Sequence, residues 1–420
     1  MHIAEAGGFE PPVQLPVRQF SKLVVSATHP HFPVGLPTKL GANIQDCFHL
    51  VKKNGRFLFK SSYICAVFQI TFGRMEQKPK RKGRKIFLWA ILSLLLIVIA
   101  GVVVVRKTIF KPFSLEETVY IYIDNEKNYE EVITQLKKAD LPSEQLFRIL
   151  SERMNYPSNI KTGRYAVKDG MTMPDVIRML RAGIQTPVKL TFNNVRTKED
   201  LAGRISQQLM MDSTLLVNAL NDPEKIKEVG FDENTLTALF IPNTYEVYWD
   251  TSIDHFLNRM KKEYDRFWSD ARKSKAEKIG LSPVQVSTLA SIVEEEATYS
   301  DEYPVVAGLY LNRLKKGMRL EADPTVKFAV GDFSLRRILF RHLEVESPYN
   351  TYRNTGLPPG PIRIPSIQAI DGTLSPQQHN YLFMCAKEDL SGKHNFAATH
   401  AEHARNAARY QRALNERGIF

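Results

Sequence analysis

The strongest hydrophobic feature of the chain is an uncharged apolar stretch from Ile86 to Val105. About 20 residues at ~1.5 Å rise per residue cross the ~30 Å hydrocarbon core of a bilayer, so the stretch predicts a transmembrane helix. A cleaved signal peptide is the alternative, but the stretch is long and the GVVVVRK at its end offers no small-residue cleavage site. We therefore expect an uncleaved membrane anchor over residues 86–105.

After the anchor, hydrophobic and polar positions follow two different periods. Period-two alternation is typical of half-buried strands, and apolar residues spaced three and four apart are typical of helices. A polar connector over residues 106–117 is expected to lead into a small module of residues 118–186. Its expected elements are strands at 118–123 and 161–167, with helices that begin near Asn128, Leu146 and Thr172.

Pro187 opens a second region with strand-like and helical segments of its own. We expect residues 187–420 to form one further folded domain. Strands and helices are both present without a regular alternation, so the predicted fold class is α+β.

One helix in the second region carries the most informative pattern. It is expected to begin with Ser282 as its N-cap and Pro283 in its first turn. At roughly 100° per residue, its apolar side chains form a single stripe of Val286, Leu289, Ile292 and Val293. Glu296 falls on that stripe, whereas Glu294 and Glu295 point away from it.

A carboxyl on a core-facing stripe is poorly hydrated, so the pKa of Glu296 should rise. A carboxylic acid that stays neutral near pH 7 can donate a proton to a leaving group. The alternative is that the helix ends here and the third Glu reaches solvent, as most glutamates do.

The net charge of +12 is partly local, because Lys and Arg are concentrated over residues 75–85. A basic run can bind nucleic acid, but directly before a membrane anchor it is typical of a cytoplasmic flank. We therefore expect a cytoplasmic basic segment, an outward-facing chain after Arg106, and no nucleic-acid partner.

The first part of the chain and the cysteines add two expectations. Residues 1–74 lack sustained periodicity and the composition changes abruptly at Met75, so we expect a spurious or disordered extension and hypothesise that Met75 is the initiator. N-terminal sequencing of the native protein tests this, and a mature chain that starts at Met1 would refute it. Of the three cysteines only Cys385 follows the anchor, which excludes an intramolecular disulfide in the outward-facing part.

An ordered set of short motifs occupies the second region. They are FIPNTYEVY (240–248), SIVEEEA (291–297), LNRL (311–314), LEADPTV (320–326), YNTY (349–352), GLPPGPI (356–362) and HNFAATHAEH (394–403). In order and spacing they resemble the endolytic murein transglycosylases of the MltG/YceG-like family, over about residues 115–415. Ala297, Asn243 and Glu321 depart from residues common in that family, so the hydrogen bonds around the acid are left open.

The resemblance implies one N-terminal transmembrane helix, a small LysM-like module that contacts glycan, and a mixed lytic-transglycosylase-like catalytic domain. It identifies Glu296 as the catalytic acid. In the implied mechanism, Glu296 protonates the glycosidic oxygen, and its carboxylate then takes the proton of the C6 hydroxyl of N-acetylmuramic acid as a 1,6-anhydro ring closes. No cofactor, metal or second carboxylate is needed, unlike in ordinary glycosidases. An alternative is that the module is only a spacer.

Further residues in these motifs are candidates for substrate contact because they offer hydrogen-bonding groups or flat faces suited to sugars. They are Asn312, Asp323, Thr325, Tyr349, Asn350 and Tyr352. Each has a local alternative role, such as a helix cap, a turn or core packing. The loop from Gly356 to Gly360 is stiffened by prolines and is expected to form a wall of the groove. Asp323 and Glu246 are also candidates for a second carboxylate in a true hydrolase.

Three histidines near the C-terminus invite a metal interpretation. His400 and His403 have a helical spacing that can hold zinc, and His394 lies nearby. A zinc site needs more ligands and a supporting shell, and an HExxH motif is absent. We therefore expect no metal, and a supporting role for His403.

The sequence thus predicts a single-pass inner-membrane enzyme with its N-terminus in the cytoplasm and its catalytic domain in the periplasm. Its expected reaction is cleavage of peptidoglycan between N-acetylmuramic acid and N-acetylglucosamine, within the glycan strand. The family's setting implies that it ends nascent strands beside peptidoglycan synthases. The alternatives are a muramidase-type hydrolase that uses water and a non-catalytic, membrane-anchored scaffold that binds glycan.

Overall fold

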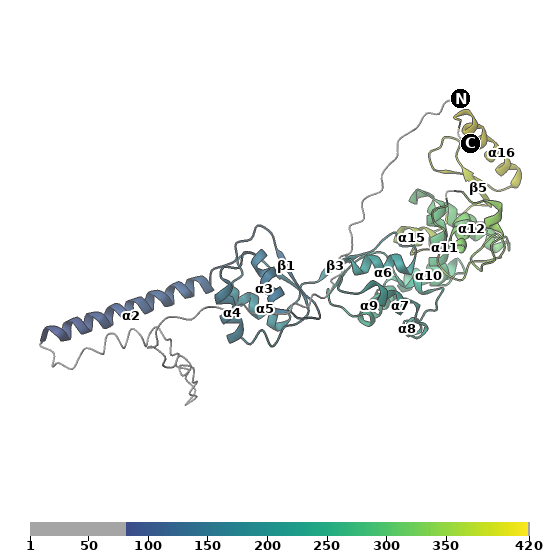
Figure 1. Cartoon of the computed structure of the whole chain (residues 1–420). Coiled ribbons are helices and arrows are strands. Elements are labelled where there is room, and N and C mark those ends of the chain that lie inside the picture. Colours follow the sequence, from purple (N-terminus) through teal and green to yellow (C-terminus); the bar gives the residue numbers. More distant parts are fainter. Residues whose placement is uncertain (1–80, 336, 419–420) are drawn as a thin grey trace, which may run out of the picture. The chain divides into compact units, whose positions relative to one another are not determined.

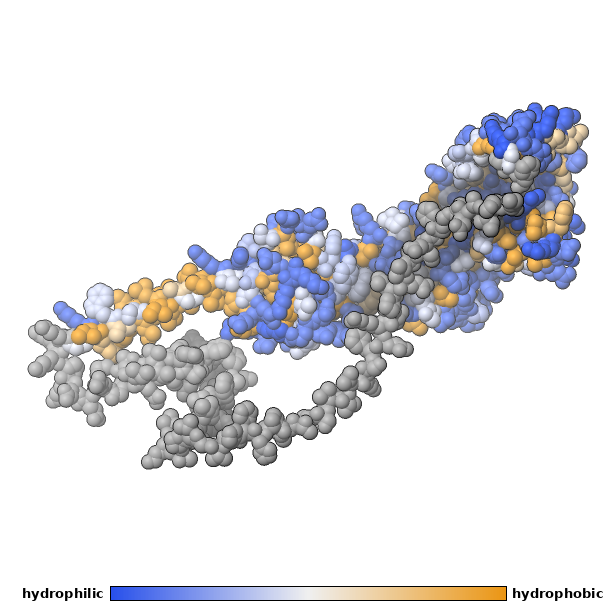
Figure 2. All heavy atoms as spheres, turned by 45° about the horizontal axis from the view of Figure 1, so that its top comes forward, coloured by the Kyte–Doolittle hydropathy of each residue, from blue (hydrophilic) through white to orange (hydrophobic). Residues whose placement is uncertain are grey.

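The computed structural model describes residues 81–335 and 337–418, and Figure 1 labels its elements. The first is α2 (Arg81–Ile109), which contains the whole predicted anchor. Within it, Gly83–Ile109 is apolar and long enough to cross a membrane, and its apolar side chains are exposed. Figure 2 shows them as a run of hydrophobic spheres. Such a helix suits a bilayer better than water. The predictions for residues 1–74 lie outside the described residues.

The next part of the chain has the predicted order of strands and helices. Strands β1 (Val119–Ile123) and β2 (Gly163–Val167) pair antiparallel. Between them lie α3 (Tyr129–Lys138) and α4 (Glu144–Arg153), and α5 (Met173–Ala182) follows. These elements enclose a hydrophobic core of their own, separate from the core of the remaining chain. The predicted strands and helices are confirmed here.

The remaining chain is mostly helical and contains two more antiparallel strand pairs. Strand β3 (Val188–Thr191) pairs with β4 (Thr244–Val247), and β5 (Phe383–Ala386) pairs with β6 (His394–Ala397). The helices, in order, are α6 (Lys198–Ser206), α7 (Ser213–Asn221), α8 (Pro223–Glu228), α9 (Ile253–Phe267), α10 (Asp270–Lys278), α11 (Pro283–Glu296), α12 (Tyr303–Lys315), α13 (Asp323–Val330), α14 (Phe340–Leu343), α15 (Ile367–Thr373) and α16 (His400–Glu416). Short 3-10 turns lie at Leu236–Leu239 and Ser300–Glu302.

Helix α11 runs through the centre of this larger core, against α12, α13 and α15. Its predicted start is confirmed, because Ser282 and Gln285 cap it reciprocally. Burial extends beyond the predicted apolar stripe, since Ser287, Thr288 and Ser291 are buried as well. From Val286 to Val293, helix α11 is therefore enclosed on every side.

Small hydroxyl side chains can be buried in this way because they bond to nearby carbonyls. Thr288 donates to the Val284 carbonyl at 2.9 Å, and Ser291 donates to the Thr288 carbonyl at 2.7 Å while it accepts the Ile362 amide at 3.0 Å. The last turn of α11 is less enclosed, and the three half-buried acids lie there.

Candidate active site

Glu296 is the last residue of α11 and is half-buried. Tyr310 of α12, itself buried, donates its hydroxyl to Glu296 Oε1 at 3.1 Å. Burial raises the pKa of Glu296 to about 7, and the nearby carboxylate of Asp323 acts in the same direction. The Tyr310 hydrogen bond acts in the opposite direction, because it stabilises the ionised form. The direction predicted from the sequence is thus confirmed.

The two neighbouring acids point elsewhere, as expected, but they do not reach open solvent. Glu295 pairs with Arg196 at 2.7 Å and with Arg363 at 2.5 Å. Glu294 accepts the backbone amide of Ser366 at 2.8 Å. Both carboxylates therefore already have donor partners within the protein. Glu296, by contrast, has no ion-pair partner among the described residues, and burial raises its pKa.

Asp323 lies opposite Glu296 at the start of α13, where Pro324 occupies the first turn. The hydroxyl of Tyr352 donates to Asp323 Oδ1 at 2.6 Å and holds this carboxylate in place. Both residues were predicted to belong to the site. The structure adds that they act as a pair.

Two pockets meet at these carboxyls. The larger, of about 440 Å³, is lined by Glu296, Leu309, Tyr310, Arg313, Leu320, Glu321, Asp323, Tyr352, Phe383, Met384, Cys385, Ala386, His394, His400 and His403. The smaller, of about 370 Å³, is lined by Glu295, Glu296, Asp323, Pro324, Lys327, Arg337 and Ile338. Glu296 and Asp323 belong to both. The acid therefore borders two adjoining pockets, so a ligand can contact it from either pocket.

Arg313 of α12 shapes the larger pocket, and sequence reasoning missed its role and that of Tyr310. The buried guanidinium of Arg313 donates to the Leu382 carbonyl at 2.6 Å, to two carbonyls before α13, and to Glu321 at 2.9 Å. It thereby ties β5 to the segment that leads into Asp323. Tyr310 and Arg313 are three residues apart on one face of α12, so helical spacing of large polar-tipped residues was the signal available.

Thr325 and Asn350 lie behind the site rather than in it. Thr325 is fully buried, and its hydroxyl pairs with that of Thr351 at 2.8 Å. Asn350 is also fully buried. Its amide donates to the Leu343 and Val345 carbonyls, and its Oδ1 accepts the backbone amide of Tyr352 at 3.0 Å. Both residues therefore fix the loop that carries Tyr352.

Asn312 and Tyr349 also use their polar groups internally. Asn312 donates to the His379 carbonyl at 2.7 Å and to the Tyr381 carbonyl at 3.2 Å. Tyr349 donates to Asn234 at 3.3 Å, and its ring packs 4.7 Å from that of Phe328. Neither lines the two pockets that contain Glu296.

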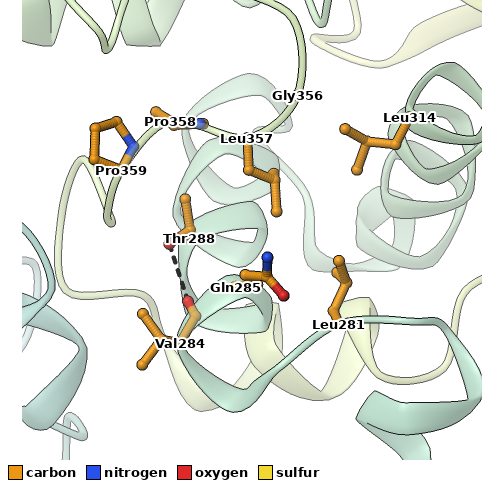
Figure 3. A pocket seen from close by; sticks show the side chains of 9 residues that line it. All are labelled: Leu281, Val284, Gln285, Thr288, Leu314, Gly356, Leu357, Pro358 and Pro359. Carbon is orange, nitrogen blue, oxygen red and sulfur yellow. Dashed lines mark hydrogen bonds between the residues drawn. The ribbon is translucent and has the colours of Figure 1, made fainter. Parts of the chain in front are cut away.

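The proline loop lies at a different place from the one expected. Gly356 to Pro359 lines a separate pocket of about 450 Å³ over the first half of α11, with Val284, Gln285 and Leu314 among its other walls. Figure 3 shows Leu357 and the two prolines above Gln285 and Thr288. Gln285 and Thr288 lie two to three helical turns before Glu296 on α11. The loop is therefore not a wall of the pockets around the acid.

The histidines border the larger pocket from the C-terminal hairpin and α16. His394 Nδ1 lies 2.9 Å from Glu302, and the ring of His403 stacks on Phe383 at 5.5 Å. Burial lowers the pKa of His403 and favours its neutral form. In the part of the chain that the structure describes, no three such side chains are grouped as metal ligands. Glu246 lies on β4 opposite Lys189, outside the lining of both pockets.

Known proteins resemble this chain in sequence over most of these elements. Residues 121–409 match the profile of the YceG-like family. The chain is 29% identical over 340 residues to the endolytic murein transglycosylase of Bacillus subtilis (strain 168), across 76% of this chain and 93% of that protein. It is 26% identical to the endolytic murein transglycosylase of Streptococcus pneumoniae serotype 2, across 70% of this chain and 58% of that protein. A crystal structure of a yceG-like protein from Listeria monocytogenes is 27% identical, with a TM-score of 0.46 over 69% of this chain and 99% of that chain.

Proposed function

The chain belongs to the YceG-like family, and on that premise we infer that it is an endolytic peptidoglycan lytic transglycosylase. The observation that carries the proposal is the position of Glu296. Its carboxyl has a pKa raised to about 7 and lies where two pockets adjoin. A protonated acid so placed can act on a bond inside a polymer, with sugar residues bound on both sides.

In the proposed reaction, Glu296 donates its proton to the glycosidic oxygen as the bond from that oxygen to the anomeric carbon of N-acetylmuramic acid breaks. The carboxylate left behind then takes the proton of the C6 hydroxyl of the same sugar, whose oxygen bonds to the anomeric carbon. A 1,6-anhydro ring results, Glu296 is protonated again, and no water is consumed. Because the nucleophile is part of the sugar already bound, no second molecule must be captured.

Asp323 and Tyr352 are proposed to assist at the reacting sugar. The Asp323 carboxylate, oriented by Tyr352 at 2.6 Å, keeps Glu296 protonated and can stabilise positive charge at the anomeric carbon. Tyr310 orients the Glu296 carboxyl. Thr325, Asn350, Asn312 and Tyr349 are then positioning residues, since their polar groups bond within the protein.

The anchor and the small module suggest how the enzyme is presented to its substrate. The β1–α3–α4–β2 order fits a LysM-like glycan-binding module over residues 118–186, and Tyr120 and Tyr122 are exposed on β1. We propose that α2 holds the chain in the inner membrane with the catalytic domain in the periplasm, near peptidoglycan synthases. Two measurements would support this arrangement. The Glu296→Gln protein should be retained less strongly on insoluble peptidoglycan when the module is deleted. A protease should reach the catalytic domain only from the periplasm.

The products of digestion test the proposed reaction. The protein is incubated with purified peptidoglycan sacculi in water enriched in heavy oxygen, and the fragments are identified by mass. We expect fragments of more than one disaccharide that end in 1,6-anhydro-N-acetylmuramic acid and contain no heavy oxygen. A boiled sample serves as the control.

The same digestion separates the two alternatives. A muramidase-type hydrolase, which the proximity of Asp323 to Glu296 makes the strongest rival, would give products heavier by one water and labelled with heavy oxygen. A glycan-binding scaffold would bind the sacculi and release no fragments.

A further inference from the structure

We propose that the smaller pocket beside Glu296 binds a carboxylate of the peptide carried by N-acetylmuramic acid, through Lys327 and Arg337. The consequence is a preference for glycan strands that still carry their peptides. This inference rests on the proposed function and adds a specificity to it.

Helix geometry places the first cation next to the reacting groups. Lys327 follows Asp323 by four residues on α13, so the two side chains lie on one face of that helix. Both line the smaller pocket together with Glu296. The charge of Lys327 is near enough to Glu296 to oppose the rise of its pKa. A ligand group held by Lys327 would therefore lie beside the acid.

The two cationic side chains of this pocket, Lys327 and Arg337, have no ion-pair partner among the described residues. Glu295, an acid in the same pocket, is already bound by Arg196 and Arg363. The Asp323 carboxylate is bound by the Tyr352 hydroxyl. Two cations therefore remain available to an anion from outside.

The larger pocket differs in this respect. Its cation is Arg313, which is buried and bound to three backbone carbonyls and Glu321. Its remaining walls are mostly aromatic, apolar or histidine side chains. The site therefore offers a free positive charge on one side of Glu296 and not on the other.

The substrate carries negative charge at few places. The sugar rings of the glycan and their N-acetyl groups are uncharged. In an intact strand the lactyl group of N-acetylmuramic acid forms an amide with the peptide, so the carboxylates lie on the peptide itself. Lys and Arg side chains are suited to bind carboxylates. The two cations thus match the peptide and have no partner on the glycan backbone.

The test compares two forms of the same strands. One form is untreated, and in the other the peptide carboxylates are converted to amides by carbodiimide with excess methylamine. We expect wild-type kcat/KM to be roughly tenfold higher on the untreated strands, a ratio that corresponds to one good charged contact. In the Lys327→Gln/Arg337→Gln double variant we expect a ratio near one. The exposed Lys316→Gln is the matched control and should keep the wild-type ratio.

The comparison uses the ratio of kcat/KM on untreated and amidated strands within each variant. A general loss of rate caused by the change in charge near Glu296 cancels in this ratio. An equal ratio in the wild type and the double variant would overturn the inference. A third substrate, stripped of peptides by an amidase, carries the free lactyl carboxylate instead. If the wild type cuts this third substrate as fast as untreated strands, and the rate depends on Lys327 and Arg337, the pocket is assigned to the lactyl carboxylate. That result would also overturn the inference. If no form is cut by the wild type, it is the proposed function that fails.

Discussion

Glu296→Gln is expected to lower the rate of strand cleavage by at least about a thousandfold, because general acid and general base roles both depend on this carboxyl. Glutamine has nearly the same size, and its Oε1 can still accept the Tyr310 hydrogen bond of 3.1 Å. The fold should therefore be intact, with a thermal unfolding midpoint equal to or above that of the wild type, since a poorly hydrated carboxyl has been removed.

The measurement is the release of soluble fragments from sacculi, with circular dichroism to check folding. Glu277→Gln, an exposed position on α10, makes the same chemical change away from the site and should have the wild-type rate. Undiminished cleavage by a folded Glu296→Gln protein would exclude Glu296 as the acid.

Asp323→Asn has the second largest expected effect, and it acts through charge. The Asp323 carboxylate raises the pKa of Glu296, so its neutralisation lowers that pKa and leaves less of the acid form at pH 7. Support for positive charge at the anomeric carbon is lost as well. We expect a fall of roughly ten- to hundredfold at neutral pH. The asparagine oxygen can still accept the Tyr352 hydroxyl, so the loop should stay in place.

A pH–rate profile distinguishes this effect from a structural one. In the wild type, activity should fall as pH rises through about 7, because the acid form of Glu296 is lost. In Asp323→Asn that alkaline fall should occur at lower pH. Asp270→Asn, at the start of α10, is the control and should leave the profile unchanged. A uniform loss of rate, with the alkaline fall at its wild-type pH, would argue against an electrostatic role for Asp323.

Local patterns were enough to predict the elements and to draw attention to Glu296. The anchor follows from one uncharged apolar run, and the strands and helices of residues 118–186 follow from period and capping residues. Helical spacing places Glu296 in line with Ile292 and Val293, which are buried, and the family resemblance then implied its role as the acid. The secondary-structure predictions need only residues close together in the sequence, whereas the role of Glu296 was implied by motifs spread over residues 240–403.

The partners of the polar side chains could not be predicted in this way. Asn312 carries an amide suited to a sugar, but it donates instead to the backbone carbonyls of His379 and Tyr381, which lie far along the chain. A residue type shows which hydrogen bonds are available, and the fold decides whether backbone or substrate receives them. The same limit applied to the proline loop, whose stiffness was evident but whose neighbours were not.

The most direct test of the central claim is a titration of the Glu296 carboxyl itself. Isotope-edited infrared difference spectra, recorded over a range of pH for the wild type and for Glu296→Gln, isolate the band of this one group. We predict a carboxylic acid that is present in the wild type only and titrates with a pKa of about 7. If the Glu296 carboxyl is already fully ionised at pH 6, as an ordinary solvated glutamate would be, the account is contradicted.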